Sequence, residues 1–99
     1  MPLHITAMKN IRQFEIILEI TRQGSISGAA ETLGVSQPTL SKLVHKLEEE
    51  LGLELFDRRC IPLKLTAAGE CCIDAATQIM DVHHRLDKQL ERIRTGTST

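Results

Sequence analysis

The stretch GAAETLGVSQPTLSKLVHKLEEELG, residues 28–52, contains two short helical patterns that meet at Gly34. Ser27 precedes the first pattern, and its hydroxyl is suited to cap that helix. Glycine readily adopts the left-handed conformation that ends many helices, so Gly34 marks the end of the first pattern. Ser36 and Pro38 then begin the second, as a cap and a first-turn proline. Two short helices joined this closely cross steeply, and the sequence therefore predicts a helix-turn-helix.

The second of these helices has one apolar face and one small, polar and basic face. Its apolar residues recur at spacings of four, three and four, which predicts burial on one side. They are Leu40, Val44, Leu47 and Leu51. Short side chains on the opposite face let the helix backbone approach base edges in the major groove of DNA. The predicted DNA contacts on this helix are Ser36, Gln37, Pro38, Thr39, Ser41, Lys42, His45 and Lys46.

The polar face offers groups that suit both bases and phosphates. Gln37 can bond adenine at two points or bridge to a phosphate, and Lys42 can reach guanine or a phosphate. Residues 36–46 include no acid. His45 borders this face, where it either contacts DNA or is simply exposed. The acidic run at residues 48–50 follows, and we expect all three carboxylates on a solvated face turned away from phosphates.

Beyond Gly52 the hydrophobic pattern changes from the period of a helix to that of a strand. The segments LELFDR and PLKLT alternate apolar and polar residues, which predicts a two-stranded hairpin. Its basic residues are Arg58, Arg59 and Lys64. We interpret the hairpin as a wing that lies on the DNA backbone, with the guanidinium of Arg58 clamping a phosphate.

A helix is predicted on each side of this region. The first covers residues 9–23 and ends at Gly24, with an expected apolar face of Ile11, Phe14, Ile17, Leu18 and Thr21. The last begins after Thr66, as its cap, and runs from about Ala67 to Ile93, a length of about 40 Å. We expect residues 94–99 to be a disordered tail.

The last helix carries a heptad seam with a 4-3 rhythm. The seam residues are Cys72, Ala76, Ile79, His83, Leu86, Leu90 and Ile93. A helix this long with one apolar stripe has little of its own domain to pack against, so we expect a homodimer through it. His83 in the seam is either a pH-sensitive dimer contact or a tolerated polar residue.

Composition sets limits on the class of protein. Ninety-nine residues suit one domain with a modest core, and the net charge of −1 gives no global sign of nucleic-acid binding. The sequence shows neither a signal-peptide pattern nor an apolar run long enough to cross a bilayer, so we expect a cytoplasmic protein with no membrane contact. The three cysteines lack metal-site spacing, and we expect idle thiols, no metal and no cofactor.

The segments SISGAAETLGVSQPTLSKLVHKLEEELGLELFDR and LKLTAAGE resemble the N-terminal DNA-binding domain of LysR-type transcriptional regulators, over Met8 to about Ile93. The resemblance implies a mainly α winged helix-turn-helix in residues 1–66 and a linker and dimerisation helix in residues 67–93, which pairs antiparallel with its twin. It also implies a dimer or tetramer acting on double-stranded operator DNA with inverted half-sites. The positions that lie at the DNA in that family match Gln37, Pro38, Thr39, Ser41, Lys42 and Arg58.

The sequence departs from the family pattern at several points. Lys42 stands where arginine is common, which weakens the case for bidentate recognition of guanine. Ile61 stands in the wing where a basic residue is frequent, which removes one phosphate contact. The family's effector-binding domain does not follow, so we expect a fragment of a longer regulator, with a naturally short relative as the alternative.

Three other interpretations compete with DNA binding. Residues 28–52 can form a helical hairpin whose polar face is merely solvated. The winged domain can be a scaffold in a protein-interaction module whose active part is the heptad helix. Cys60 or Cys71 with a histidine can be catalytic, but no oxyanion motif, phosphate loop or orienting carboxylate accompanies them, so we expect no enzyme. Two adjacent alanines, the turn glycine followed by Val35 and the absence of acids before Glu48 favour DNA binding over the first. Basic residues on the helix face and the wing favour it over the second.

Overall fold

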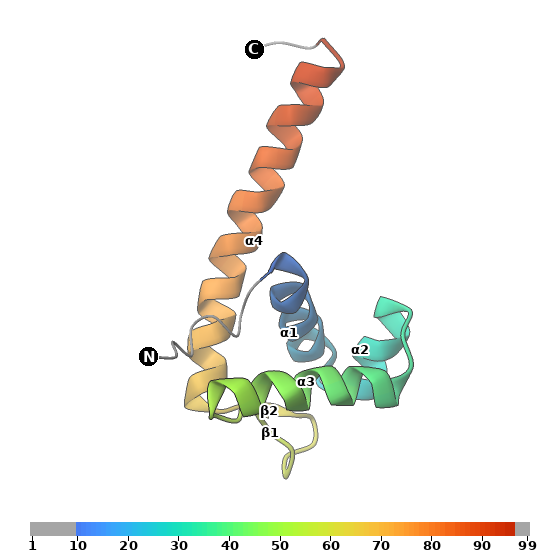
Figure 1. Ribbon diagram of the computed structural model, residues 1–99, viewed down its shortest axis with the longest axis vertical. Helices are drawn as coiled ribbons and strands as arrows, with labels where there is room; N and C mark the ends of the chain where they lie inside the picture. The colour runs from blue at the N-terminus through green and yellow to red at the C-terminus, as the bar shows by residue number, and fades with distance from the viewer. Residues whose placement is uncertain (1–9, 97–99) are drawn as a thin grey trace.

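The computed structural model describes residues 10–96 and has the predicted winged helix-turn-helix architecture with a long C-terminal helix (Figure 1). Its elements are α1 (Ile11–Gln23), α2 (Ile26–Leu33), α3 (Gln37–Leu51), β1 (Phe56–Asp57), β2 (Lys64–Leu65) and α4 (Ala67–Arg94). The first three helices cluster together, and the hairpin lies beside α3. Helix α4 runs alongside α1 and continues well beyond it, so that the molecule measures 50 × 37 × 21 Å.

The turn between α2 and α3 depends on a few small residues. Gly34 has a φ of 73°, and the next amide, of Val35, donates to the carbonyl of Ala30 at 3.0 Å. This closes α2 with a left-handed residue, which glycine adopts without strain. Ala29 and Ala30 are buried where the helices meet. The predicted turn, the cap at Ser36 and the first-turn proline of α3 are confirmed.

The start of α2 differs from the prediction. Ser25, and not Ser27, is the cap: its Oγ accepts a hydrogen bond from the amide of Gly28 at 3.0 Å. Ser25 has the extended backbone of a cap residue, because the chain leaves α1 at Gly24 and turns immediately. Helix α2 therefore begins at Ile26, before the predicted start at Gly28. The side chain of Ile26 packs against the core.

The buried face of α1 is also displaced from the predicted one. Ile16, Ile17 and Ile20 are buried, whereas Phe14 and Leu18 are only half-buried. Apolar residues occur on several sides of this helix, and the contacts with α2 and α4 decide which side is covered. The core of the described residues consists of Ile16, Ile17, Ile20, Ala29, Ala30, Leu40, Val44, Leu47, Leu55 and Phe56.

The wing is shorter than the prediction. Its antiparallel strands contain two residues each, with Phe56 opposite Leu65 and Asp57 opposite Lys64. Residues 53–55 stay outside β1 because the amide of Leu55 donates to a side chain of α3 and its carbonyl accepts from the amide of Thr66.

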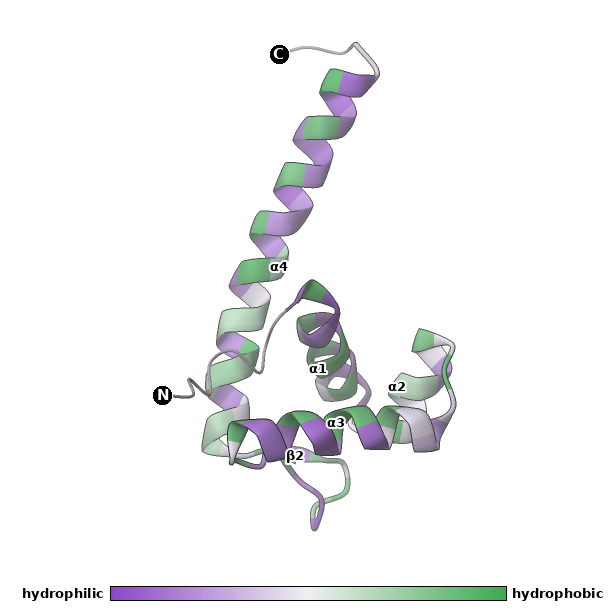
Figure 2. Cartoon of the chain, in the orientation of Figure 1, coloured by the Kyte–Doolittle hydropathy of each residue, from purple (hydrophilic) through white to green (hydrophobic). Residues whose placement is uncertain are grey.

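Helix α4 has a packed part and a projecting part. Thr66 caps it, as predicted, with its Oγ1 accepting from the amide of Gly69 at 3.0 Å. Ala76 and Met80 are buried within the chain. Farther along, the hydrophobic stripe continues on an exposed surface (Figure 2). Its exposed members are Val82, Leu86, Leu90 and Ile93.

Ala76 corrects one assignment in the predicted dimer seam. Its side chain is 0% exposed in the single chain, where α4 packs against α1, so it has no surface to offer a partner. Helix α4 ends at Arg94, one residue beyond the prediction, and Thr95 and Gly96 form a turn. The rest of the expected tail, residues 97–99, lies outside the described residues, as do residues 1–9. None of the described helices combines the length and apolar character needed to cross a bilayer.

Candidate nucleic-acid interface

The outer side of α3 presents the residues that the sequence predicted for DNA contact. The opposite side of the same helix is buried through Leu40, Val44 and Leu47. All the predicted contacts on the outer side are exposed except Ser41, which is half-buried. They are Ser36, Gln37, Pro38, Thr39, Lys42, His45 and Lys46. The fold thus brings these side chains together on one uncovered helix face.

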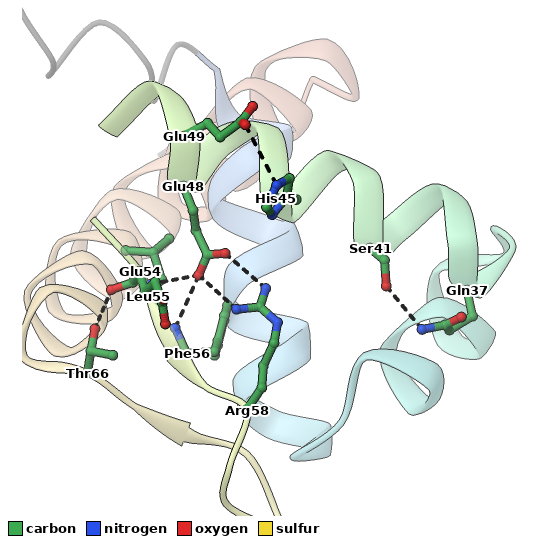
Figure 3. Close-up of polar contacts among 10 residues, drawn as sticks. All are labelled: Gln37, Ser41, His45, Glu48, Glu49, Glu54, Leu55, Phe56, Arg58 and Thr66. Carbon is green, nitrogen blue, oxygen red and sulfur yellow. Dashed lines mark hydrogen bonds and ion pairs between the residues drawn. The ribbon is translucent and has the colours of Figure 1, made fainter. Parts of the chain in front are cut away.

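Hydrogen bonds arrange the polar groups at the start of α3. The Oγ of Ser36 accepts from the amide of Thr39 at 3.2 Å, and its hydroxyl donates to the Oγ1 of Thr39 at 2.7 Å. The side-chain Nε2 of Gln37 donates to the Oγ of Ser41 at 3.0 Å (Figure 3). These bonds hold the short side chains close to the helix. Ser36 thereby caps the first turn of α3.

Two lysines supply the positive charge of this face. Lys42 and Lys46 are exposed and form no ion pair with any of residues 10–96. The Nε2 of His45 lies 3.7 Å from a carboxylate oxygen of Glu49. A hollow of about 360 Å³ adjoins these side chains. Its lining residues are Ser41, Lys42, His45, Lys46, Glu49 and Arg58, so the wing contributes to the same surface.

In the wing, Arg59 lies in the turn after β1 and is paired with Asp57, the last residue of that strand. Its Nε and Nη2 donate to the Asp57 carboxylate at 2.9 and 3.0 Å, and its backbone amide donates at 3.0 Å. The hydrogen bonds from the Arg59 side chain and backbone lower the pKa of Asp57 to about 2, and the same pairing raises the pKa of Arg59. Asp57 therefore remains ionised at neutral pH and offsets the charge of Arg59. Lys64 on β2 is exposed and has no ion pair in the described chain.

Glu48 contradicts the prediction for the acidic run. Glu49 and Glu50 are exposed as expected, but Glu48 is only 6% exposed. Its carboxylate accepts from Arg58 at 2.9 Å, so the predicted phosphate clamp already has a partner (Figure 3). The helical spacing carries a signal for this burial, because Glu48 lies four residues after Val44 and within the stripe that buries α3. The charge of three consecutive glutamates concealed that signal.

The loop between the two strands of the wing carries an apolar residue. Ile61 is 97% exposed, so the position expected to lack a phosphate contact presents an apolar side chain.

The thiols of Cys60, Cys71 and Cys72 are free, and partial burial raises the pKa of Cys72. In the described part of the chain, no three His, Cys, Asp or Glu side chains form a group suited to a metal ion.

Comparison with known proteins identifies a family. Residues 11–70 match the family described as "Bacterial regulatory helix-turn-helix protein, lysR family". The HTH-type transcriptional regulator TfdT of Cupriavidus pinatubonensis is 31% identical over 88 residues, which cover 89% of this chain and 39% of that protein. The HTH-type transcriptional regulator MetR of Haemophilus influenzae is 34% identical over 85 residues, 86% of this chain and 28% of that protein. The chain thus spans well under half the length of these curated relatives.

Solved structures with the same fold include complexes with DNA. The BenM_DBD/catB site 1 DNA complex superposes with a TM-score of 0.80 at 29% identity, covering 88% of this chain and 94% of that one. The Vibrio fischeri DarR structure, in complex with DNA, gives a TM-score of 0.76 at 27% identity, covering 87% of this chain and 30% of that one. These neighbours place the observed fold among proteins whose structures were determined on DNA.

Proposed function

This chain belongs to the LysR family of bacterial helix-turn-helix regulatory proteins, and on that premise we propose that it binds double-stranded operator DNA sequence-specifically, as part of a transcriptional regulator. Helix α3 would enter the major groove, and the wing would lie on the backbone. One observation carries the proposal. The outer face of α3 is uncovered, and it combines short polar side chains with Lys42 and Lys46, which have no acidic partner in the described chain.

The surface suggests a division of roles. Gln37 lies in the first turn of α3, where an amide can both donate to and accept from a base edge. The proposed base contacts also include Ser36, Pro38, Thr39 and Ser41. Lys46 and Lys64 are the cations best placed to attract phosphates, and Lys42 can serve either a base or a phosphate. His45 and Arg59 border the surface, where nearby carboxylates offset the charge of Arg59 and, when it is protonated, that of His45.

The projecting part of α4 supports a proposed homodimer. A groove of about 420 Å³ beside it is lined almost entirely by apolar atoms of residues from α1 and α4. The lining residues are Ile11, Gln78, Ile79, Val82, His83 and Leu86. Leu90 and Ile93 continue the same stripe on an exposed surface. A second α4 helix would cover this stripe and place two α3 helices on inverted half-sites, with tetramers possible for a longer regulator.

This proposal involves binding alone, with neither catalysis nor a cofactor. The relatives are transcriptional regulators, and their names point to no reaction. Because DNA in bacteria lies in the cytoplasm, a cytoplasmic location is part of the same proposal.

Selection of bound duplexes from a random DNA pool, followed by affinity measurements, tests the proposal. We expect a two-fold-symmetric consensus. Gln37→Ala should cost about 1–3 kcal/mol of binding free energy on that consensus and much less on an unrelated duplex, because a base contact carries sequence information. Gln89→Ala is the matched control, since Gln89 is exposed on the projecting part of α4.

Two outcomes would count against this function. Selection that enriches no consensus would mean that the chain does not read sequence. Equal loss of affinity on both duplexes in Gln37→Ala would remove this side chain from base recognition and leave α3 as a nonspecific contact.

A further inference from the structure

Glu48 is the only charged side chain that is buried among residues 10–96. Its Oε2 accepts from the backbone amides of Leu55 at 2.7 Å and Phe56 at 3.3 Å. The same oxygen accepts from Nη1 of Arg58 at 3.4 Å, and its Oε1 accepts from Nη2 at 2.9 Å. A buried carboxylate is tolerated when it is paired and hydrogen-bonded in this way. Figure 3 shows all four bonds converging on the one side chain.

The two hydrogen bonds from backbone amides to the Glu48 side chain fix the wing to α3. Glu48 belongs to α3, whereas Leu55 and Phe56 lead into the first strand of the wing. The segment at residues 54–56 is also tied to α4, because the hydroxyl of Thr66 donates to the carbonyl of Glu54 at 2.6 Å. A side chain at Gly69 would place its Cβ 2.0 Å from the carbonyl oxygen of Leu55, so α4 lies directly against this segment. Glu48 thus links the wing to α3, while α4 and its cap Thr66 hold the same segment from the other end.

The bonds to Arg58 have a second consequence, which concerns charge. Arg58 lines two hollows. One is shared with Lys42 and Lys46, and the other, of about 290 Å³, is shared with Gln37 and Ile61. Its guanidinium thus occupies the junction of α3 and the wing. Glu48 holds that guanidinium through both terminal nitrogens and cancels its positive charge.

We propose that Glu48 is a positioning residue for DNA recognition, which holds Arg58 in one orientation and neutralises it. Arg58 would then donate a directed hydrogen bond to a base edge of the DNA and add little general attraction to phosphates. This inference rests on the proposed function and differs from the sequence-based prediction, in which Arg58 is a free phosphate clamp.

The test is a salt series with the full chain on the selected consensus duplex and on an unrelated duplex. The wild type and the double variant Glu48→Gln with Arg58→Ala should have the same slope of log affinity against log salt concentration, because neither carries a net charge at this pair. Glu48→Gln retains an acceptor for the backbone amides and releases one positive charge. We expect its slope to become steeper by about 0.9, as for one further neutralised phosphate.

Specificity supplies a second measurement. Glu48→Gln should lower the ratio of consensus to unrelated affinity about tenfold, as for the loss of one good base-directed contact. Arg58→Ala should lower the ratio by a similar factor. The double variant Glu48→Gln with Arg58→Ala should recover the wild-type slope without recovering the ratio. Glu50→Gln, which removes the same charge from an exposed position of α3, is the control, and its ratio should not change.

The outcomes separate this inference from the function on which it rests. A wild-type chain that binds neither duplex would overturn both. Wild-type binding with an unchanged slope in a folded Glu48→Gln would overturn this inference alone. Should Glu48→Gln fail to fold by circular dichroism, Arg58→Ala decides through the ratio of consensus to unrelated affinity. An unchanged ratio with equal loss on both duplexes would show a general phosphate contact and overturn the proposal, and a ratio lowered about tenfold would support it.

Discussion

The two halves of α4 carry the same heptad pattern but lie in different surroundings. In the first half, Ala76 and Met80 are buried against the chain's own core. In the second half, Leu86 is 49% exposed and Leu90 is 53% exposed, with no other part of the described chain covering them. Figure 1 shows why: α1 runs beside the lower part of α4 only. A hydrophobic periodicity thus identifies the face of a helix that is covered but does not identify what covers it.

The difference has a physical origin in the lengths of the two helices. Helix α4 has 28 residues and α1 has 13, so α1 covers less than half of the longer helix. The first half of the stripe gains its stability from intramolecular burial, which is present at any protein concentration. In the proposed dimer, the second half would gain it only from association, so its contribution would depend on concentration. Substitutions in the two halves should therefore have different effects.

The largest expected effect belongs to the packed half. Ala76→Asp places a carboxylate in a fully buried site without a partner, which should lower the free energy of unfolding by about 3–5 kcal/mol. Denaturant titration at low protein concentration measures the change. Ala75→Asp, at the exposed neighbouring position, should change the same free energy by less than about 0.5 kcal/mol. Equal effects at the two positions would mean that the first half of α4 does not pack on the core.

An intermediate effect is expected in the projecting half. Leu86→Asp should weaken the dimer by roughly 2–3 kcal/mol, because a charge would have to be buried at the interface, while each winged domain stays folded. Sedimentation gives the mass, and circular dichroism monitors the fold. Lys88→Gln changes the net charge by the same single unit on the other side of the helix and should leave the dimer intact. A Leu86→Asp chain that remains dimeric at micromolar concentration would remove the projecting stripe from the proposed interface.

The smallest expected effect distinguishes two neighbouring thiols at the start of the packed half. Cys71 is exposed, whereas Cys72 is half-buried and its pKa is raised by burial. Because the thiolate is the reactive form, Cys72 should be alkylated several-fold more slowly near pH 8 and should need a higher pH to reach half its maximal rate. Mass spectrometry after timed alkylation measures both rates. Equal rates across the pH series would place Cys72 in solvent.

The same raised pKa has a defined consequence for stability. The folded chain holds the Cys72 proton more tightly than the unfolded chain does, so the stabilising contribution is present below the ordinary thiol pKa and is lost as pH rises through the folded value. Cys72→Ser should reduce this loss of stability at alkaline pH, whereas Cys71→Ser should leave it unchanged.

Sequence alone determined the limits of α3 and the character of its outer face. Ser36, Pro38 and Gly52 mark its two ends through hydrogen bonds and backbone preferences that act within one helical turn. Its buried residues follow from the helical period, which is also a local property. Local rules failed at α2, where Ser25 and Ser27 both have the chemistry of a cap and only the path of the chain after α1 selects Ser25.

Only the tertiary structure decided which charges remain available at the proposed DNA-binding surface. Glu48 and Arg58 are ten residues apart, and neither helical nor strand periodicity relates them. They meet because the chain turns back after α3 and presents the amides of Leu55 and Phe56 to the same carboxylate. The length of α1 likewise determines where along α4 the packed half ends. Long-range pairing depends on how completed elements pack, and a pattern confined to one element contains no information about its neighbour.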